Sequence, residues 1–155
     1  EEELSAFWAY QMMISGAEAE EFLWERFRII TIEDIGLANP NALLIVGEAK
    51  RLYYELPSKH FDRFSTGIFT TSYLARSPKT RYTHEMLSMI KGGLKDGTMT
   101  PEIPDYALDF HFPQHREKGR DLLHYLTEGA KLANEDTTFP TKYREWLIKR
   151  VKEGM

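Results

Sequence analysis

The chain of 155 residues contains no cysteine. Disulfide bonds, thiolate nucleophiles and cysteine-ligated zinc sites are therefore excluded together, and a reducing compartment is compatible with the composition. Long apolar segments are missing too, because the longest run, Ala42 to Val46, is far too short to cross a bilayer. The acidic start EEELSAFW differs from a secretory signal peptide, which begins with basic residues. We expect a soluble, cytoplasmic protein.

Signatures of catalysis are also scarce. A phosphate-binding loop of the form GxxxxGK[ST] is absent, because no glycine is directly followed by lysine. The pair Gly92-Gly93, between Lys91 and Lys95, is more typical of a helix end. No serine has the GxSxG setting of an esterase. We therefore expect no catalytic residue and no bound cofactor in this chain.

A metal site can be drawn from two histidines. His111 and His115 are four residues apart, and Asp105 and Asp109 lie nearby in the sequence. Pro113 lies between the histidines, which disfavours a regular helix there, and the chain has no HExxH motif. We favour ordinary connector side chains over a metal-dependent hydrolase.

Charge is unevenly distributed along the chain, whose net charge is -4. Residues 1–48 contain ten acidic and two basic residues, residues 49–100 contain four and nine, and residues 101–155 contain ten and nine. The middle third is therefore the candidate surface for a polyanion. We favour the simpler interpretation, in which the two halves neutralise each other. The basic residues that could contact nucleic acid are Arg76, Lys79, Arg81, Lys91 and Lys95, although a solvated helix face is commoner.

Apolar residues recur every three or four positions along nearly the whole chain, which predicts an all-α fold in one compact multi-helix domain, residues 1–155. Ser15, three residues before Glu18, predicts a capping box that opens the second helix. The segment GIFTTSYL has high β-propensity, but its helical surroundings favour a helix. The predicted buried stripes are Leu4, Phe7, Trp8 and Met12; Leu23, Phe27 and Ile30; Ala42, Val46, Ala49, Tyr53 and Leu56; Phe61, Phe64 and Ile68; and Tyr82, Met86 and Met89 with Leu87, Ile90 and Leu94.

Two more helices are predicted after an ordered connector. Residues 97–113 contain three prolines and predict a connector with at most one helical turn. One helix is then expected around Leu122, Tyr125 and Leu126, and another around Tyr143, Trp146, Leu147 and Val151. Trp8, Trp24, Tyr53, Tyr54 and Trp146 are many aromatics for one small core, so we expect some of them at subunit contacts.

The segment TIEDIGLANPNALLI, residues 31–45, predicts a corner between two helices. The four residues from Ile29 to Ile32 are all β-branched, which lowers helix propensity, and Gly36 can adopt the positive φ of a helix terminus. Pro40 biases Asn39 away from the helical region, and Asn41 can cap the next helix.

The two acids of this corner, Glu33 and Asp34, allow two interpretations. They could be paired catalytic carboxylates, one a proton donor and the other a base. Adjacent residues at a helix end do not face each other, however. We favour a structural role, in which they accept hydrogen bonds from turn N–H groups or pair with Arg26 or Arg28.

The segment EDIGLANPNAL resembles the EDIGLADP signature of the replication-associated recombination protein A family (MgsA). These AAA+ ATPases are related to Werner helicase interacting protein and similar to clamp loaders. The upstream segment LSAFWAYQMMISGAEAEEFLWERF is similar to that family's helix, glycine-containing turn and helix, and YLARSPKTRYTHEML is similar to its second helix junction. The resemblance covers roughly residues 4–105. Many members continue after the position of Pro104 with a segment rich in Gly and Tyr, which this chain lacks, so residues 106–155 are expected to be divergent.

The resemblance implies an all-helical C-terminal domain of the clamp-loader type, which follows an ATPase core and holds subunits together, in that family as a tetramer. The whole protein is then expected to be a nucleoid-associated, DNA-dependent ATPase of stalled or gapped replication forks. Its expected partners are DNA, single-strand-binding protein and the replication machinery, and ATP and Mg²⁺ would bind the preceding core. The residues carried over are structural: Glu33, Asp34, Gly36, Leu37, Pro40 and Pro78, with Lys79 beside the last. The alternative is a helical DNA-binding module that acts through the basic middle segment.

Overall fold

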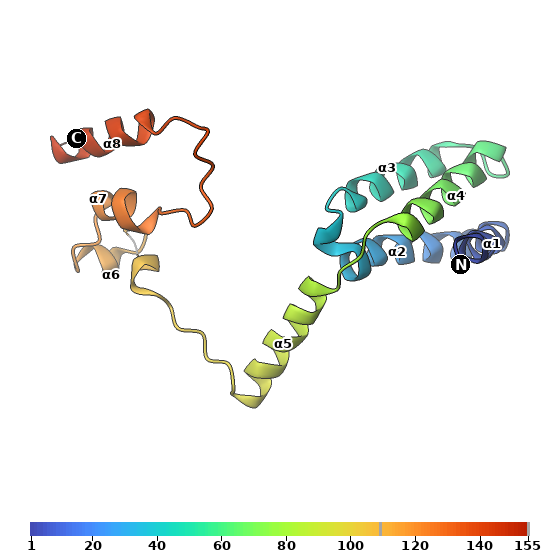
Figure 1. Ribbon diagram of the computed structural model, residues 1–155, viewed down its shortest axis with the longest axis horizontal. Coiled ribbons are helices and arrows are strands. Elements are labelled where there is room, and N and C mark those ends of the chain that lie inside the picture. The colour runs from blue at the N-terminus through green and yellow to red at the C-terminus, as the bar shows by residue number, and fades with distance from the viewer. Residues whose placement is uncertain (109, 155) are drawn as a thin grey trace. The chain divides into compact units, whose positions relative to one another are not determined.

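The computed structural model describes residues 1–108 and 110–154. The chain divides into two compact units, Glu1–Met99 and Thr100–Met155. All regular elements of the described residues are helical, which confirms the predicted all-α class (Figure 1). None of the helices in the described part of the chain has the length and apolar character to span a membrane. The expected organisation as a single domain, with a core of 1–105, stays a prediction.

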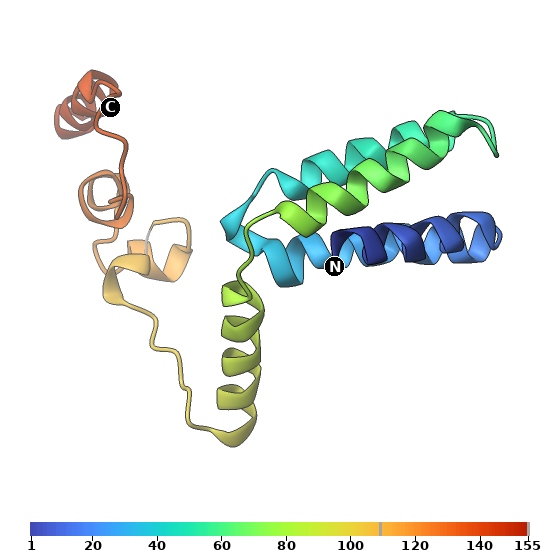
Figure 2. The ribbon, with the colours of Figure 1, turned by 45° about the vertical axis from the view of Figure 1, so that its right-hand side comes forward.

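Four antiparallel helices form the body of the first unit (Figures 1 and 2). They are α1 (Glu2–Ile14), α2 (Ala17–Ile30), α3 (Ala42–Glu55) and α4 (Phe61–Arg76). Helix α1 packs against α2 and α4, and α3 packs against the same two helices. Between α2 and α3 lie a π-helical turn, η1 (Thr31–Ile35), and a 3₁₀ turn, η2 (Gly36–Ala38). Helix α5 (Tyr82–Asp96), the fifth helix of this unit, contacts η1 and η2.

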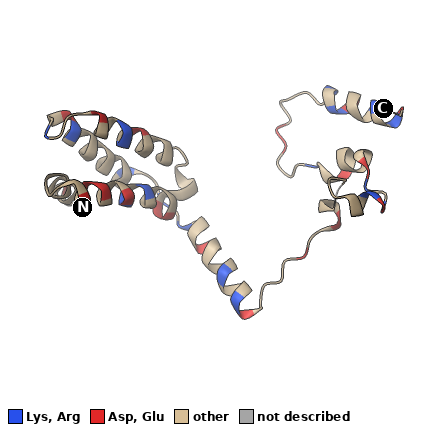
Figure 3. Ribbon diagram, turned by 180° about the vertical axis from the view of Figure 1, so that it is seen from behind, with Lys and Arg blue, Asp and Glu red and all other residues tan. Residues whose placement is uncertain are grey.

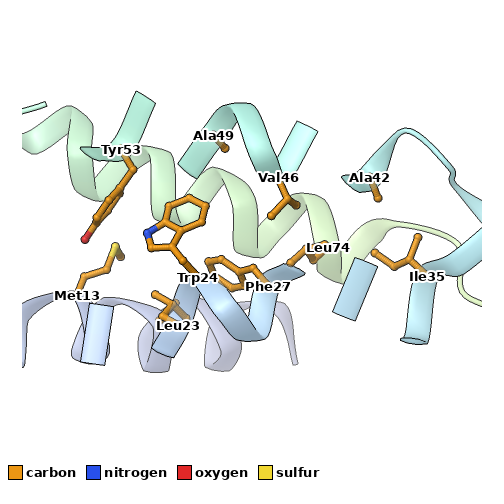
Figure 4. Close-up of a cluster of buried hydrophobic side chains, with 11 residues drawn as sticks. Met13, Leu23, Trp24, Phe27, Ile35, Ala42, Val46, Ala49, Tyr53 and Leu74 are labelled. Carbon is orange, nitrogen blue, oxygen red and sulfur yellow. The ribbon is translucent and has the colours of Figure 1, made fainter. Parts of the chain in front are cut away.

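The core of the first unit is centred on aromatic rings from α2 and α3 (Figure 4). Trp24 is fully buried and makes edge-to-face contacts with Phe27 and Tyr53, at centroid distances of 5.4 and 5.1 Å. Gly67 on α4 leaves room for Met13, whose sulfur occupies the space that a Cβ would fill. Close approach of α1 to α4 therefore depends on the absence of a side chain at this position.

One arginine side chain is buried in the same core. Arg63 on α4 is buried, lies over the Tyr53 ring with 4.3 Å between the guanidinium carbon and the ring centroid, and pairs with Glu20 at 2.6 Å. Its guanidinium also donates to the Leu56 carbonyl at 3.1 Å. Arg63 thus connects α2, the end of α3 and α4, with most of its charge compensated inside the bundle.

Several sequence predictions for these helices are wrong in detail. The buried residues of α1 are Ala9 and Met13, while Leu4, Phe7 and Trp8 of the predicted stripe are more than half exposed. No residue of the predicted stripe on α5 is buried. The second helix begins after Gly16, whose φ is 121°, and the Ser15 hydroxyl donates back to the Gln11 carbonyl at 2.6 Å instead of forming a capping box. On α4 the buried residues are Arg63, Gly67, Thr70, Thr71 and Leu74, while Phe61 is 80% exposed. Phe64 and Ile68 of the predicted stripe are partly buried against the core, and the buried positions lie beside them, where Gly67 allows Met13 of α1 to come close.

The segment GIFTTSYL is helical within α4, as predicted. Thr70 and Thr71 donate their hydroxyls to the carbonyls of Thr66 and Gly67, each at 2.9 Å. These bonds satisfy two buried hydroxyls inside the helix, which is how β-branched residues are accommodated there.

The second unit contains short helices. They are η3 (Asp105–Ala107), α6 (Pro113–Arg116), α7 (Leu122–His124), the π-helical η4 (Tyr125–Gly129) and α8 (Lys142–Lys152). Helix α8 packs against α7 and η4, and η4 also contacts η3. The two predicted helices are present, and the connector contains the one expected turn. Helix α6 was not predicted: Pro113 starts it, because a proline is tolerated in the first helical position.

Candidate functional site

The corner between α2 and α3 begins with a widened helical turn. Residues Thr31–Ile35 continue α2 as a π-helix, so the β-branched run widens the helix where the sequence predicted that it ends. Thr31 donates its hydroxyl to the Arg28 carbonyl at 2.6 Å, and Ile35 is fully buried. The extra residue of the π-turn directs Ile35 into the core and leaves Glu33 and Asp34 at the surface side of the turn.

Gly36 ends this turn. Its N–H donates to the Thr31 carbonyl, and its φ and ψ are 51° and -136°. A Cβ at this position would lie 3.0 Å from the Thr80 carbonyl oxygen. Glycine is therefore required at this position for two reasons: the backbone conformation and the close approach of the segment that precedes α5.

Asn39 fixes the start of α3. Its backbone is non-helical, with φ and ψ of -146° and 82°, in line with the restriction on a residue before Pro40. Its carbonyl accepts from the Ala42 N–H at 3.0 Å, and its side-chain amide donates to the Tyr73 hydroxyl at 2.8 Å. The predicted side-chain cap by Asn41 is wrong, because Asn41 makes no such hydrogen bond. Sequence reasoning missed Asn39, since its partners lie on α4, more than thirty positions away.

The second junction, residues 77–81, packs onto the corner. The Thr80 N–H donates to the Asp34 carbonyl at 2.8 Å. Arg81 pairs with the Asp34 carboxylate at 2.7 Å, and His84 Nδ1 lies 3.8 Å from Glu33. The expected pairing of the acids with Arg26 or Arg28 is thus wrong: their partners come from the start of α5. Each carboxylate faces a different residue, as expected for adjacent positions on a helical turn.

Lys79 closes the end of α4. Its ammonium group donates to the carbonyls of Leu74, Ala75 and Ser77 at 3.0, 2.9 and 2.9 Å. These are carbonyls that a helix C-terminus leaves without backbone partners, and a cation there also interacts favourably with the helix dipole. Pro78 lies in the same junction, after Ser77, whose extended backbone stops the helix.

The five basic residues predicted to contact nucleic acid differ in their surroundings. Figure 3 shows Lys and Arg interspersed with Asp and Glu along the helices. Arg76 pairs with Glu2 at 3.0 Å, Lys79 caps α4, and Arg81 pairs with Asp34. Lys91 and Lys95 are exposed on α5. Three of the five cations therefore already have partners within the first unit.

The predicted structural residues converge on one place. Glu33, Asp34 and Gly36 meet the junction after Pro78, Pro40 precedes α3, and Leu37 is exposed beside them. A hollow of about 460 Å³ adjoins this corner; its floor is apolar and includes Phe27 and Leu74, and Asp34, Lys79 and Arg81 line one side. The polar groups of that side are bound to one another or to backbone carbonyls, so the corner is built to hold α2, α3, α4 and α5 together.

The histidines of the second unit are arranged around aromatic and basic neighbours. The rings of His111, Phe110 and Tyr125 contact one another, with centroid distances of 4.3 to 5.3 Å, and His124 contacts Arg120 through Nε2 at 2.6 Å. Asp105 pairs with Arg120, and Asp109 lies outside the described residues. In the part of the chain that the structure describes, no group of three or more His, Asp or Glu side chains is placed to hold a metal ion.

One family model matches the chain. It is described as MgsA AAA+ ATPase C terminal, and the match extends over residues 2–147. It therefore continues well beyond residue 105 and includes most of the segment whose sequence departs from many members. No curated protein and no solved structure gave a significant match.

Proposed function

Because the chain belongs to the family of MgsA AAA+ ATPase C-terminal domains, it is a non-catalytic part of such an ATPase, and we propose that it assembles the subunits of that enzyme. The proposed whole is a homo-oligomer, with a tetramer as the expected state. Its proposed task is DNA replication, recombination and repair at stalled forks, with ATP and Mg²⁺ bound in the ATPase core and with DNA and single-strand-binding protein as partners. A nucleoid-associated, cytoplasmic location is part of the same proposal.

The observation that carries the proposal is the apolar surface of the first unit. Large apolar side chains are exposed on all five of its helices; examples are Trp8 on α1, Phe22 on α2, Leu44 on α3, Phe69 on α4 and Leu87 on α5. Soluble monomers seldom expose contiguous apolar patches of more than a few hundred Å², and larger ones mark interaction sites. Assembly would remove much of this surface from water.

The five aromatic residues predicted at subunit contacts differ in their exposure. Trp24 and Tyr53 are fully buried and belong to the core, whereas Trp8 and Trp146 are 59% and 60% exposed. Of the five aromatics predicted from the sequence, Trp8, Trp146 and the half-exposed Tyr54 thus remain available for subunit contacts. Aromatic residues are enriched at the centres of protein interfaces, where they bury large areas.

Light scattering on the purified chain tests the proposal. We expect a mass of several chains at micromolar concentration, with dissociation on dilution. A strict monomer at the highest soluble concentration would refute it. Binding of single-stranded DNA that falls steeply with added salt, without any self-association, would instead favour the DNA-binding module predicted from the basic middle segment.

A further inference from the structure

An open groove lies between α3 and α4. It has a volume of about 540 Å³, and its walls include Leu44, Ala49 and Leu52 of α3 and Phe69 of α4. Leu44 is 72% exposed and Phe69 is 56% exposed. The groove therefore offers an apolar surface that no element of the first unit covers among the described residues.

The polar groups of this groove are satisfied or negatively charged. Ser65 and Thr66 donate their hydroxyls to the carbonyls of Phe61 and Asp62, one turn earlier. Asp62 and Glu48 supply carboxylates at the rim. Glu48 shares Arg51 with Glu55, so these three residues and Asp62 carry a net charge of -2. The groove consequently suits an apolar helix face that is flanked by cations.

Helix α5 has such a face. No residue of this helix is buried, although its sequence is amphipathic. Leu87, Lys91, Leu94 and Lys95 have the spacing i, i+4, i+7 and i+8, which places them on one side of a helix. Leu87 and Leu94 are 55% and 56% exposed, and neither Lys91 nor Lys95 has a carboxylate partner among the described residues.

The two surfaces match in length as well as in charge. At 1.5 Å per residue, Leu87 to Leu94 spans about 10 Å of α5, and Leu44 to Leu52 spans about 12 Å of α3. Helix α5 leaves the corner at η1 and η2 and does not run beside α3 or α4 (Figures 1 and 2), so the groove is not filled by the chain's own α5.

Another amphipathic helix, α8, is a weaker candidate. Its Leu147 and Val151 are partly buried, because α8 already packs against α7 and η4. Its Lys149 and Arg150 lie within 4 Å of the Glu153 carboxylate, at 3.8 and 3.6 Å. Among the described residues, Lys91 and Lys95 of α5 have no such carboxylate partner, and no residue of α5 is buried.

We propose that α5 of one copy of the chain docks, through Leu87, Lys91, Leu94 and Lys95, into the α3/α4 groove of a second copy. This inference rests on the proposed assembly function and names the surfaces that carry it. Because the two surfaces differ, the contact either repeats head-to-tail from copy to copy or is exchanged reciprocally between two copies around a two-fold axis. Repetition of such a contact closes a ring when the rotation between copies allows it, which accommodates more than two subunits.

The absence of native cysteine permits a direct test by disulfide trapping. Leu87→Cys or Leu94→Cys chains are mixed with Leu44→Cys or Leu52→Cys chains and oxidised, which gives four combinations. We expect mixed disulfide dimers in severalfold excess over a control in which Leu4→Cys on α1, whose exposure lies between those of Leu44 and Leu52, replaces the groove variant. One pair of combinations should dominate and thereby report whether α5 lies parallel or antiparallel to α3. Yields equal to the control in all four would refute the docking.

A second chain carrying both Leu52→Cys and Leu94→Cys separates docking between copies from docking within one. Reduced, diluted into an excess of the cysteine-free chain and only then oxidised, it should form little disulfide if the contact is between copies. A disulfide that still forms within one chain would overturn the proposal.

Charge reversal gives an independent readout. Lys91→Glu/Lys95→Glu should weaken self-association at least tenfold in light scattering, and mixing with Glu48→Lys/Asp62→Lys chains should restore part of it. Lys118→Glu/Lys142→Glu makes the same charge change in the second unit and should leave assembly unaltered. If the unmodified chain is monomeric, the proposed function itself fails; if it assembles without trapping or charge rescue, only this docking fails.

Discussion

Replacement of Gly36 by alanine should destabilise the first unit more than any other single methyl addition at an exposed turn. The new side chain would adopt a φ of 51° with a ψ of -136°, a combination that non-glycine residues rarely occupy. Its Cβ would also lie 3.0 Å from the Thr80 carbonyl oxygen. The backbone conformation costs about 1–3 kcal/mol and the close contact adds a cost of similar size, so the free energy of unfolding should fall by about 2–5 kcal/mol.

Two other glycines separate these contributions. Gly16 also has a positive φ, of 121°, but a Cβ there would meet nothing within 4 Å, so Gly16→Ala reports the conformational cost alone. Gly47 lies inside α3 with open space around it, and Gly47→Ala should stabilise the protein by about 0.5–1 kcal/mol because alanine favours helices.

Urea unfolding monitored by Trp24 fluorescence measures all three variants. Trp24 is buried in the first unit, so a Trp8→Phe/Trp146→Phe background makes it the reporter of that unit. With a urea dependence of about 1–3 kcal/mol per molar, the Gly36→Ala midpoint should fall by on the order of 1–2 M. The reasoning is refuted if Gly36→Ala unfolds at the same urea concentration as Gly47→Ala.

Three further changes test the interior and the corner. Asp34→Asn removes the ion pair with the exposed Arg81 but keeps the hydrogen bond from the Thr80 N–H to the Asp34 carbonyl, so the free energy of unfolding should fall by no more than about 1 kcal/mol. A double-mutant cycle with Arg81→Gln measures the coupling energy of the pair. A coupling energy above that value would contradict a junction held mainly by backbone hydrogen bonds. Glu20→Gln leaves the buried Arg63 guanidinium without its counterion and should cost about 3 kcal/mol in urea unfolding, whereas Glu21→Gln, on an exposed pair, should cost far less. Burial raises the pKa of Tyr53 to about 12, so its neutral form stabilises the fold below the ordinary pKa of about 10 and this stabilisation is lost as the pH rises through 12. Tyr53→Phe should therefore flatten the fall of the urea midpoint between pH 9 and pH 11.5, leaving the part due to Tyr54, whose pKa burial also raises; an unchanged slope would contradict this assignment.

The helices were predictable because their signals are local. Apolar periodicity placed α1 to α5 and α8, and Gly36 and Pro40 placed the corner, because positive φ and the restriction before proline are properties of single residues. The capping box failed for the opposite reason: Gly16 could take the cap position with an unusual backbone conformation, and Ser15 found a carbonyl in the preceding turn. Choice between such alternatives depends on how α1 and α2 pack.

The partners within the corner could not be predicted from sequence alone. Asp34 and Arg81 are forty-seven positions apart, and Asn39 and Tyr73 are thirty-four apart. The nearby arginines, Arg26 and Arg28, were reasonable partners by sequence distance. The π-turn rotates the acids away from them and toward the start of α5, and π-turns have no dependable sequence signature. The buried face of α4 was missed similarly, because Gly67 and the threonines are core residues only where α1 comes close.

The corner between α2 and α3 and the proposed docking surface are connected through α5. Because Gly36 has no side chain, Thr80 in the segment before α5 can lie against it. Asp34 then binds the same segment: its carbonyl accepts from the Thr80 N–H and its carboxylate pairs with Arg81. These contacts fix the first turn of α5, whereas Leu87, Lys91, Leu94 and Lys95 lie beyond it and are exposed. A rigid anchor at the start of a helix sets the direction in which its far end projects, and a head-to-tail contact closes into a ring only for particular directions. The acids of the corner therefore act through geometry: they orient the helix by which, in the proposed assembly, one copy reaches the next.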